Sequence, residues 1–329
     1  MPYIVYLGIR HRSLTLFTAA NPGIPSGGFV GESKSAILAR LSHVPDFQLL
    51  SSGLPSDERY RMVKEFMTAH NLSYPVVLKP DVGERGTGVA IARNDRHVSS
   101  YLAVAACDTI IQKYVDGFEF GIFYCRYPGV SQGRILSITE KRFPAIVGDG
   151  VSTITELVLS DERAVCLADL YLGRLKRPPD EVPVDAEVIP LAELGSHCRG
   201  AVFLNGASLE TDILRTAVDA IAQSYEGFSI GRFDVRSASI QDLQSGRFEV
   251  LELNGVSAEA THIYDPSVSL LEAYRTLYHQ WRIAFEIGAI NRLAGFDPMP
   301  PIEFLRLVLQ RTNGPSWLPI GTSDWQAGM

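Results

Sequence analysis

Residues 248–255 read FEVLELNG, a short apolar run that ends in a carboxylate, an amide and a glycine. Side chains alternate between the two faces of a strand, so Glu252 and Asn254 share one face and their Cα atoms lie roughly 6.6 Å apart. Carboxylate and amide oxygens are ligands that suit Mg²⁺, which also keeps positions open for phosphate oxygens. The stretch therefore predicts a strand that carries two ligands of a metal ion.

A second stretch, GRFDVR at residues 231–236, alternates in the same way. It places Arg232, Asp234 and Arg236 on one face and two apolar side chains on the other. If the two strands pair as a hairpin, Asp234 joins the ligands of the first strand. Two carboxylates so close together repel unless a cation lies between them. The alternative is a buried ion-pair network of Arg232, Asp234 and Glu252 without a metal.

The composition is that of a globular protein with enough apolar residues for a full core, since 46% of its 329 residues are hydrophobic. Thirty basic against 37 acidic residues give a net charge of -7. We find no Lys/Arg run that would follow a phosphate backbone, so a nucleic-acid partner is not expected. The cysteines show no CxxC spacing, which predicts neither a zinc site nor a disulfide framework and favours a reduced cytosol. These are Cys107, Cys125, Cys166 and Cys198.

The first residues, MPYIVYLGIRHR, contain an apolar stretch that is too short to span a bilayer and lacks the features of a signal peptide. A membrane-proximal segment, which would hold the protein at the inner face of the membrane, stays open as an alternative to a purely cytoplasmic protein.

Apolar periodicity and turn residues predict an alternation of helices and strands along the chain. Helices are expected at residues 35–42, 57–70, 211–225 and 269–293, and strands at 74–80, 88–94, 110–115, 118–126, 231–236 and 247–255. Residues 133–158 are expected to add another strand, a loop and the start of a helix. The strands 74–80 and 88–94 read as a hairpin with a long glycine-rich connection. Residues 160–200 give no clear pattern.

Lys79 ends an apolar strand and is followed by DVGERGTG, residues 81–88. Gly83, Gly86 and Gly88 allow backbone N–H groups to approach a ligand closely, as a phosphate-binding loop requires. The Walker A pattern GxxxxGK[ST] is absent, and a strand rather than a helix follows, so neither of the two commonest phosphate loops is present. The alternative is a flexible hairpin tip with an exposed lysine.

The stretch QKYVDGFEFGIFY, residues 112–124, has the features of a nucleoside site. The backbone around Tyr114 and Val115 can present hydrogen-bonding groups to a flat base, and Glu119 in an otherwise apolar strand can accept both hydroxyls of a ribose. The alternative for Glu119 is an exposed strand position.

A further polar segment, GSHCRGAVFLNG at residues 195–206, contains His197 and Arg199. Arginine offers a bidentate fork to a carboxylate or a phosphate, so this pair is a candidate for binding a substrate carboxylate or a transferred phosphate. A surface turn with solvated charges explains the two residues as well.

Taken in order, these segments resemble the ATP-grasp superfamily of carboxylate–amine ligases, which includes D-alanine:D-alanine ligase, cyanophycin synthetase and the glutathione synthetases. The resemblance runs from about residue 34 to about residue 265 and rests on the ordered occurrence of SKSAILARL, VVLKPDVGERGTGV, IIQKYVDGFEF, TEKRFPAIVGDGVSTITELV, GRFDVR and FEVLELNG. It implies an α+β (α/β) fold in which two α+β subdomains, residues 34–115 and 116–265, clasp ATP. Residues 1–33 would form a short N-terminal segment and residues 266–329 a C-terminal helical extension.

The resemblance also implies a set of nucleotide-binding residues spread over several segments. These are Lys34, Lys79, Gly83, Gly86, Thr87, Gly88, Gln112, Tyr114, Val115, Glu119 and Lys141. Lys79 and the glycine-rich loop would contact phosphates, Glu119 the ribose, and Lys141, in preference to Arg142, the terminal phosphates. Gln112 is a departure, since the family often has a glutamate there that reads the adenine amino group.

For the reaction itself, the resemblance implies that Asp234, Glu252 and Asn254 bind Mg²⁺ or Mn²⁺, with two ions expected. Arg232 and Lys141 would be the catalytic residues that steady developing charge. The partners would be a small-molecule carboxylate and an amine, joined through an acyl phosphate with release of ADP and phosphate. Two alternatives stay open: a small-molecule kinase with the same nucleotide site, and a non-catalytic ATP-binding regulatory protein.

Both ends of the chain depart from the family. D-alanine:D-alanine ligase has a sizeable domain before its first ATP lysine, whereas 33 residues precede Lys34 here. In the C-terminal extension, a helix carries apolar residues that we expect to pack in a core, with membrane-surface or subunit contact as the alternative. These residues are Leu270, Leu271, Tyr274, Leu277, Tyr278, Trp281, Phe285 and Ile287. The sequence leaves the oligomeric state open.

Overall fold

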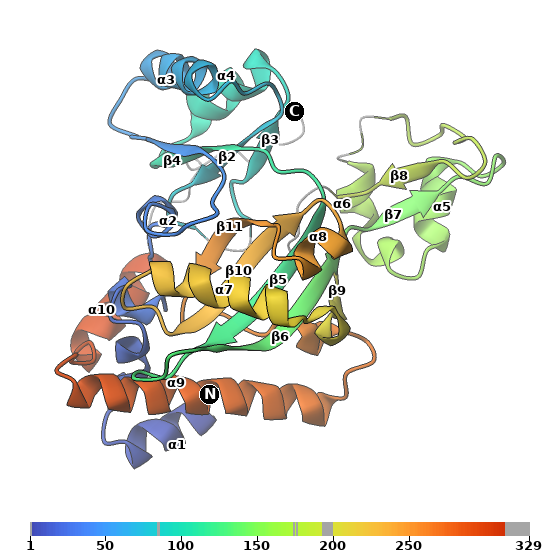
Figure 1. Cartoon of the computed structure of the whole chain (residues 1–329). Helices are drawn as coiled ribbons and strands as arrows, with labels where there is room; N and C mark the ends of the chain where they lie inside the picture. The colour runs from blue at the N-terminus through green and yellow to red at the C-terminus, as the bar shows by residue number, and fades with distance from the viewer. Residues whose placement is uncertain (1, 84–85, 174, 176, 193–199, 313–329) are drawn as a thin grey trace.

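Two antiparallel sheets dominate the computed structural model, which describes residues 2–83, 86–173, 175, 177–192 and 200–312. Figure 1 shows the four-stranded sheet above the five-stranded one, a small lobe to one side, and a layer of helices beneath. Helices and strands both contribute substantially, so the expected mixed α+β class is confirmed.

The four-stranded sheet has the strand order β1-β4-β2-β3. Its strands are β1 (Phe47–Leu50), β4 (Thr109–Lys113), β2 (Val76–Pro80) and β3 (Ala90–Ala92), and the predicted β2–β3 hairpin is present. Helices α3 (Ser56–Ala69) and α4 (Asp95–Val104) cover one face, where they bury Val76, Leu78 and Ile111. Because side chains alternate, Lys79 and Gln112 lie on the opposite face.

The five-stranded sheet has the order β11-β10-β5-β6-β9. Its strands are β11 (Glu249–Asn254), β10 (Ile230–Ser237), β5 (Phe118–Cys125), β6 (Arg134–Arg142) and β9 (Val202–Asn205). The connection from β10 to β11 contains the short helix α8 (Ile240–Gln244). The predicted pairing of β10 with β11 is confirmed: Asp234 lies opposite Glu252 and Arg232 opposite Asn254, with a register shift just after Asp234. The three predicted metal ligands are therefore neighbours.

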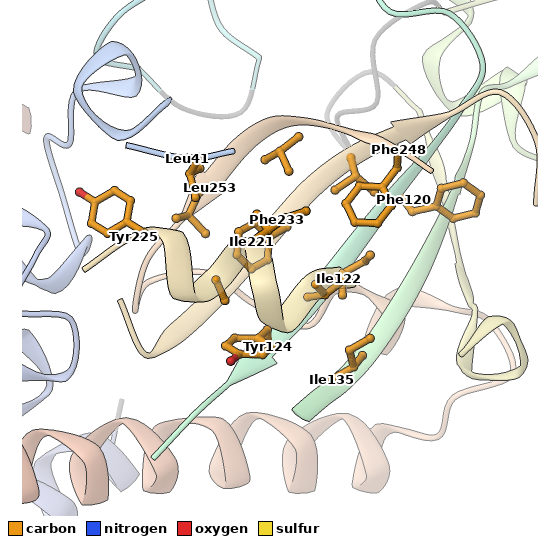
Figure 2. Close-up of a cluster of buried hydrophobic side chains, with 14 of the residues drawn as sticks. Leu41, Phe120, Ile122, Tyr124, Ile135, Ile221, Tyr225, Phe233, Phe248 and Leu253 are labelled. Carbon is orange, nitrogen blue, oxygen red and sulfur yellow. The ribbon is translucent and has the colours of Figure 1, made fainter. Parts of the chain in front are cut away.

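Helix α7 (Asp212–Ser224) packs across one face of this sheet and forms the largest apolar cluster. Figure 2 shows Ile221 of the helix over Phe120, Ile122 and Phe233 of the sheet. Alternation then directs the polar residues of β5 and β10 to the other face, which is turned toward the four-stranded sheet at one end and covered by helices at the other.

The helical layer on that other face comes from both ends of the chain. Helix α9 (Leu270–Leu293) packs against η1 (Leu16–Ala20) and α1 (Pro2–Arg10), and α10 (Pro301–Thr312) lies nearby. Asn291 in α9 donates hydrogen bonds to the carbonyls of Ala19, at 2.8 Å, and Ala20, at 3.3 Å. Segments η2 (Pro25–Gly27) and α2 (Lys34–Leu38) then lead from this layer toward the space between the sheets.

The expectation that α9 packs its apolar residues in a core is wrong for its first turns. Leu270, Leu271, Tyr274 and Tyr278 are 73%, 60%, 49% and 47% exposed, whereas Phe285 is completely buried. The buried positions of α9 begin only at Gln280 and continue to Asn291, where the helix contacts η1. The periodicity of the sequence marks an apolar face but does not say how much of it another element covers.

The small lobe comprises β7 (Ala145–Val147) paired with β8 (Val188–Pro190), together with η3 (Ala164–Leu167), α5 (Ile154–Ser160) and α6 (Ala168–Leu172). Helix α5 begins with a capping box in which Thr153 and Glu156 satisfy each other's backbone N–H groups. The short segments η5 (Ala207–Leu209) and η6 (Thr261–Tyr264) belong to the main body. Within the described ranges, no helix is both long enough and apolar enough to cross a membrane.

Candidate active site

A cavity of about 820 Å³ lies between the two sheets and contains most of the residues that the sequence singles out. Its lining includes Lys34, Lys79, Gly83, Gly86, Thr87, Gln112, Tyr114, Val115, Glu119, Lys141, Arg232, Asp234, Glu252 and Asn254. Gly88 is not part of this lining, and its carbonyl accepts a hydrogen bond from Tyr101. His197 and Arg199 lie outside the described residues. A second cavity, of about 790 Å³, between residues 18–40 and 295–303 contains none of the predicted site residues.

Asp234 is the centre of the ion pairs in the first cavity. Its Oδ1 lies 3.0 Å from Arg232 Nε and 3.0 Å from Lys141 Nζ, and its Oδ2 accepts from Asn254 Nδ2 at 3.1 Å. Burial alone would raise the pKa of this carboxyl, but the charges of Arg232 and Lys141 outweigh burial and hold the pKa well below its usual range. Asp234 therefore stays ionised although it is only 6% exposed.

Gly121 provides the room for this arrangement. It lies opposite Asp234 on the neighbouring strand β5. A Cβ at this position would lie 3.2 Å from Arg232 Cδ and 3.5 Å from both Asp234 Oδ1 and Thr261 Oγ1. The absent side chain thus lets three polar side chains converge over the sheet.

Glu119 links Lys141 to a further cation, Arg236, on the same face. Its Oε1 accepts from Lys141 at 2.9 Å and its Oε2 accepts from Arg236 Nη2 at 3.2 Å. Burial lowers the pKa of Lys141, but Asp234 and Glu119 more than compensate, so its pKa lies above the usual value. Arg142, the alternative to Lys141, is exposed and pairs with Glu140 at 2.7 Å. The structure thus places Lys141, and not Arg142, in the cavity.

Lys79 differs from Lys141 because the oxygens that it contacts are neutral. Its Nζ donates to Gln112 Oε1 at 2.8 Å and to the carbonyl of Leu251 at 3.1 Å. Burial lowers the pKa of Lys79 to about 8, against smaller opposing effects of Glu252 and other charges. The contact with Lys79 also fixes the orientation of the Gln112 amide. An ammonium can only donate hydrogen bonds, so the amide oxygen must face Lys79. The Nε2 of Gln112 is then a buried donor without a hydrogen-bond partner among the described residues.

Lys34 connects the N-terminal segment to the glycine-rich loop. Ser33 caps α2 by accepting a hydrogen bond from the backbone of Ala36, so that Lys34 begins the helix. The Lys34 side chain donates to the carbonyl of Gly83 and lies 3.5 Å from Glu252 Oε1. The adjacent backbone N–H of Ser35 donates to the carboxylate of Asp81, at 2.7 Å. Lys34 therefore lies between the loop and the predicted metal ligands.

The residues present are chemically suited to a divalent cation. Glu252, Asp234 and Asn254 supply hard oxygen donors from two paired strands, as Mg²⁺ prefers. Within the described part of the chain there is no group of three or more His, Cys, Asp or Glu side chains that could hold a metal. The amide oxygen of Asn254 is therefore needed as the third donor. A cation would compete with Arg232 and Lys141 for Asp234, whereas the side chain of Glu252 is already 31% exposed.

Several residues of the lining were not singled out from the sequence as site residues. Arg236 shares its strand face with Asp234, a position that the alternation of β10 already gives. Besides Glu119, it contacts the carbonyl of Val115, at 2.8 Å, and the ring of Tyr114, 5.5 Å from its centre. The remaining unpredicted lining includes Phe29, Val30, Glu32, Lys113, Phe203, Ser257, Glu259, Thr261, Tyr264 and Val308. Most of these come from segments without a distinctive motif.

Comparison with known proteins gives a partial match in sequence. No family model matches the chain. Cyanophycin synthetase from Synechocystis sp. (strain ATCC 27184 / PCC 6803 / Kazusa) is 36% identical over 96 residues, which cover 26% of this chain and 10% of that protein. The match thus spans about a tenth of the length of this curated relative.

The similar solved structures include D-alanine–D-alanine ligase from Bacillus anthracis, with 18% identity and a TM-score of 0.44 over 82% of this chain and 70% of that one. They also include a bifunctional glutathione synthetase from Pasteurella multocida, with 16% identity and a TM-score of 0.39 over 73% of this chain and 34% of that one. All three proteins are ATP-grasp ligases, the superfamily that the motifs of this chain resemble.

Proposed function

We propose that this chain is an ATP-dependent carboxylate–amine ligase that works through an acyl phosphate and releases ADP and phosphate. The observation that carries the proposal is the convergence of Lys79, Lys141 and Arg232 with Asp234 and Glu252 in one cavity between two sheets. Such a set of cations and carboxylates suits phosphoryl transfer, in which positioning and charge neutralisation provide most of the catalysis.

The nucleotide would bind with its base near the connection between β4 and β5. Residues 114–117 join the two sheets, and Gln112 offers a buried donor there for an acceptor atom of the base. Glu119 would accept the ribose hydroxyls in exchange for one of its present cations. The phosphates would then extend past Lys79 and under the glycine-rich loop toward Asp234 and Glu252.

The first chemical step joins the carboxylate substrate to the γ-phosphorus of ATP. A carboxylate oxygen attacks as the bond to the β–γ bridging oxygen breaks, which gives the acyl phosphate and ADP. Lys141 and Arg232 would neutralise the transferred group, and Lys79 would hold the phosphates of the leaving ADP. Magnesium held by Asp234, Glu252 and Asn254 would supply Lewis-acid neutralisation of phosphate charge.

The second step is the attack of the amine on the acyl carbon. The carbon–oxygen bond to phosphate breaks, phosphate leaves, and the amine gives up a proton to the departing phosphate or to solvent as the amide forms. Arg232 is suited to stabilise the oxyanion of the tetrahedral intermediate, because Asp234 holds its Nε while its Nη1 donates to the carbonyl of Glu259, at 2.9 Å. No nucleophile of the protein is required.

The test is ATP turnover in the presence of a fractionated bacterial metabolite extract, with and without hydroxylamine. Hydroxylamine intercepts an activated acyl group, so a hydroxamate identified by mass spectrometry reports both the reaction class and the mass of the acid. We expect ATP-dependent hydroxamate from the wild-type protein and none from Glu252→Gln. The matched control is Glu249→Gln, which alters an acid three residues earlier in β11 that is not part of the cavity lining and should retain activity.

Other outcomes distinguish the alternatives. ADP together with a stable phosphorylated metabolite and no hydroxamate would identify a kinase instead. Tight binding of ATP without ADP formation in any fraction would favour a regulatory nucleotide-binding protein. Full activity of Glu252→Gln would contradict the metal assignment whichever product is formed.

A further inference from the structure

Helix α1 is apolar on its solvent-facing side as well as on its packed side. Leu7 is 1% exposed and packs in the cluster formed with α9, whereas Val5, Tyr6 and Ile9 are 52%, 52% and 69% exposed. A surface helix normally turns polar side chains to water, and a helix that is apolar all round is normally covered on both sides. Within the described part of the chain, the outer side of α1 therefore lacks the cover that its composition leads us to expect.

The exposed surface continues from α1 onto α9. The ring of Tyr3 lies 5.9 Å from that of Tyr6 and 4.5 Å from that of Tyr278, which in turn lies 6.1 Å from Tyr274. Leu271 precedes these tyrosines at helical spacing and is 60% exposed. We call this surface the α1/α9 face. It consists of Val5, Tyr6, Ile9, Leu271, Tyr274 and Tyr278.

The α1/α9 face lies away from the candidate active site. Figure 1 shows α1 and α9 side by side beneath the five-stranded sheet, whereas the four-stranded sheet lies above it, at the far end of the same face. The residues of the face are absent from the lining of the cavity between the sheets. A partner on this face would leave the entrance between the two sheets free.

The charge around the face is opposite in sign to that of the whole protein. Residues 1–14 and 270–293 hold five arginines and two glutamates, whereas the rest of the chain has 25 basic and 35 acidic residues. Of the arginines, Arg10, Arg12, Arg275 and Arg282 are exposed. One of the two glutamates, Glu286, is itself engaged by Tyr127 and lies 3.6 Å from Arg282.

We propose that the α1/α9 face binds an anionic lipid surface, with α1 lying in the plane of the headgroups. The combination of exposed aliphatic residues, tyrosines and arginines is that of an interfacial helix, in which tyrosine rings lie at the headgroup level and arginines contact lipid phosphates. Helix α1 has nine residues and is too short to span a bilayer. A second copy of the chain is a poorer occupant, because a symmetric contact would bring the same positive rim against itself.

The test is co-sedimentation of the full-length protein with vesicles of phosphatidylcholine alone or with phosphatidylglycerol added, at low and high salt. We expect binding to the anionic vesicles, weaker binding at high salt, and little binding to the neutral vesicles. Arg10→Gln/Arg12→Gln should weaken vesicle binding on the order of 30-fold, from the loss of two basic groups near an anionic surface. Val5→Ser/Ile9→Ser should weaken it through lost apolar burial, even at low salt.

Two controls keep the result specific. Val184→Ser alters a residue of the small lobe that is 73% exposed, and it should bind vesicles like the wild type. Thermal unfolding of each variant checks that it is folded, and light scattering of the lipid-free protein measures its oligomeric state. Absence of wild-type binding to anionic vesicles, equal binding to neutral ones, or a dimer that Val5→Ser/Ile9→Ser dissociates would each overturn the proposal. Vesicle binding requires no turnover, so its result is independent of the ligase assay.

Discussion

If the chain binds a nucleotide as proposed, Lys79 should make the nucleotide affinity depend on pH, because the partners of this lysine are neutral. Burial lowers its pKa to about 8, and its hydrogen bonds go to an amide oxygen and a backbone carbonyl. A phosphate in contact with the lysine would return its pKa toward or above the usual 10.5. Binding then takes up a proton whenever the free protein has lost it, so nucleotide affinity should fall as the pH rises above 8.

The size of the effect follows from the difference between the two pKa values. Between pH 7.5 and pH 9.5, the dissociation constant of Mg²⁺ with a non-hydrolysable ATP analogue should rise about 20-fold, because each pH unit above the lower pKa costs up to a factor of ten. The phosphates of the nucleotide are already fully ionised in this range, so the change belongs to the protein. Calorimetric titration in buffers of different ionisation enthalpy would measure both the affinity and the proton uptake.

The matched variants are Lys79→Arg and Lys79→Met. Arginine stays charged throughout this range and methionine is never charged, so both variants should bind more weakly than the wild type at pH 7.5 but show affinities that change little with pH. A wild-type affinity that is independent of pH would refute the lowered pKa. An equally steep dependence in Lys79→Arg would show that another group is titrating.

Two further predictions concern the neighbours of Lys79 and the central ion pairs. Gln112→Glu places a carboxylate 2.8 Å from the Lys79 ammonium, so the lysine should hold its proton to higher pH, and the loss of nucleotide affinity should begin well above pH 8 in the same titration. Asp234→Asn leaves the buried side chains of Arg232 and Lys141 without their shared counter-charge and should lower the free energy of unfolding by about 3–5 kcal/mol in urea denaturation at pH 7. Because the folded pKa of Asp234 is lowered, the stability that it contributes is present above its unfolded pKa near 4 and is lost as the pH falls below it, so the difference between variant and wild type should shrink in acid. A difference that stays constant from pH 7 to pH 3 would contradict this assignment.

The sequence predicts the central part of the site because that part depends on local alternation. Asp234 and Glu252 lie on strands whose side-chain period is two, and the connection between the strands is short, so their pairing follows from the apolar pattern. Lys79 and Gln112 are likewise placed by the faces of β2 and β4. The same alternation places Arg236 on the face of the predicted site, so the sequence could have identified it as a site residue. Its contact with Glu119 supports that assignment.

The rest depends on contacts between distant segments, which local patterns do not specify. Phe203 enters the cavity because β9 pairs with β6 about 60 residues earlier, and Thr261 does so through a hydrogen bond to Thr139. Helix α4 is missing from the predicted helices for a different reason, because its sequence does contain the indicators of a helix. Asn94 caps the helix by accepting from the N–H of His97, and Val98, Tyr101 and Leu102 follow at helical spacing.

The central cations and carboxylates explain how the site stays folded before a nucleotide arrives. Lys141, Arg232 and Arg236 share two buried carboxylates, Asp234 and Glu119, so none of the three is buried without a counter-charge. When phosphate and metal bind, each charged side chain would exchange one oppositely charged partner for another. The cations would contact phosphate oxygens, and the carboxylate of Asp234 would bind the metal. Lys79, with neutral partners, is the exception, and it therefore gains the most when a phosphate binds. This difference between two buried lysines is the reason that the pH dependence should follow Lys79 and not Lys141.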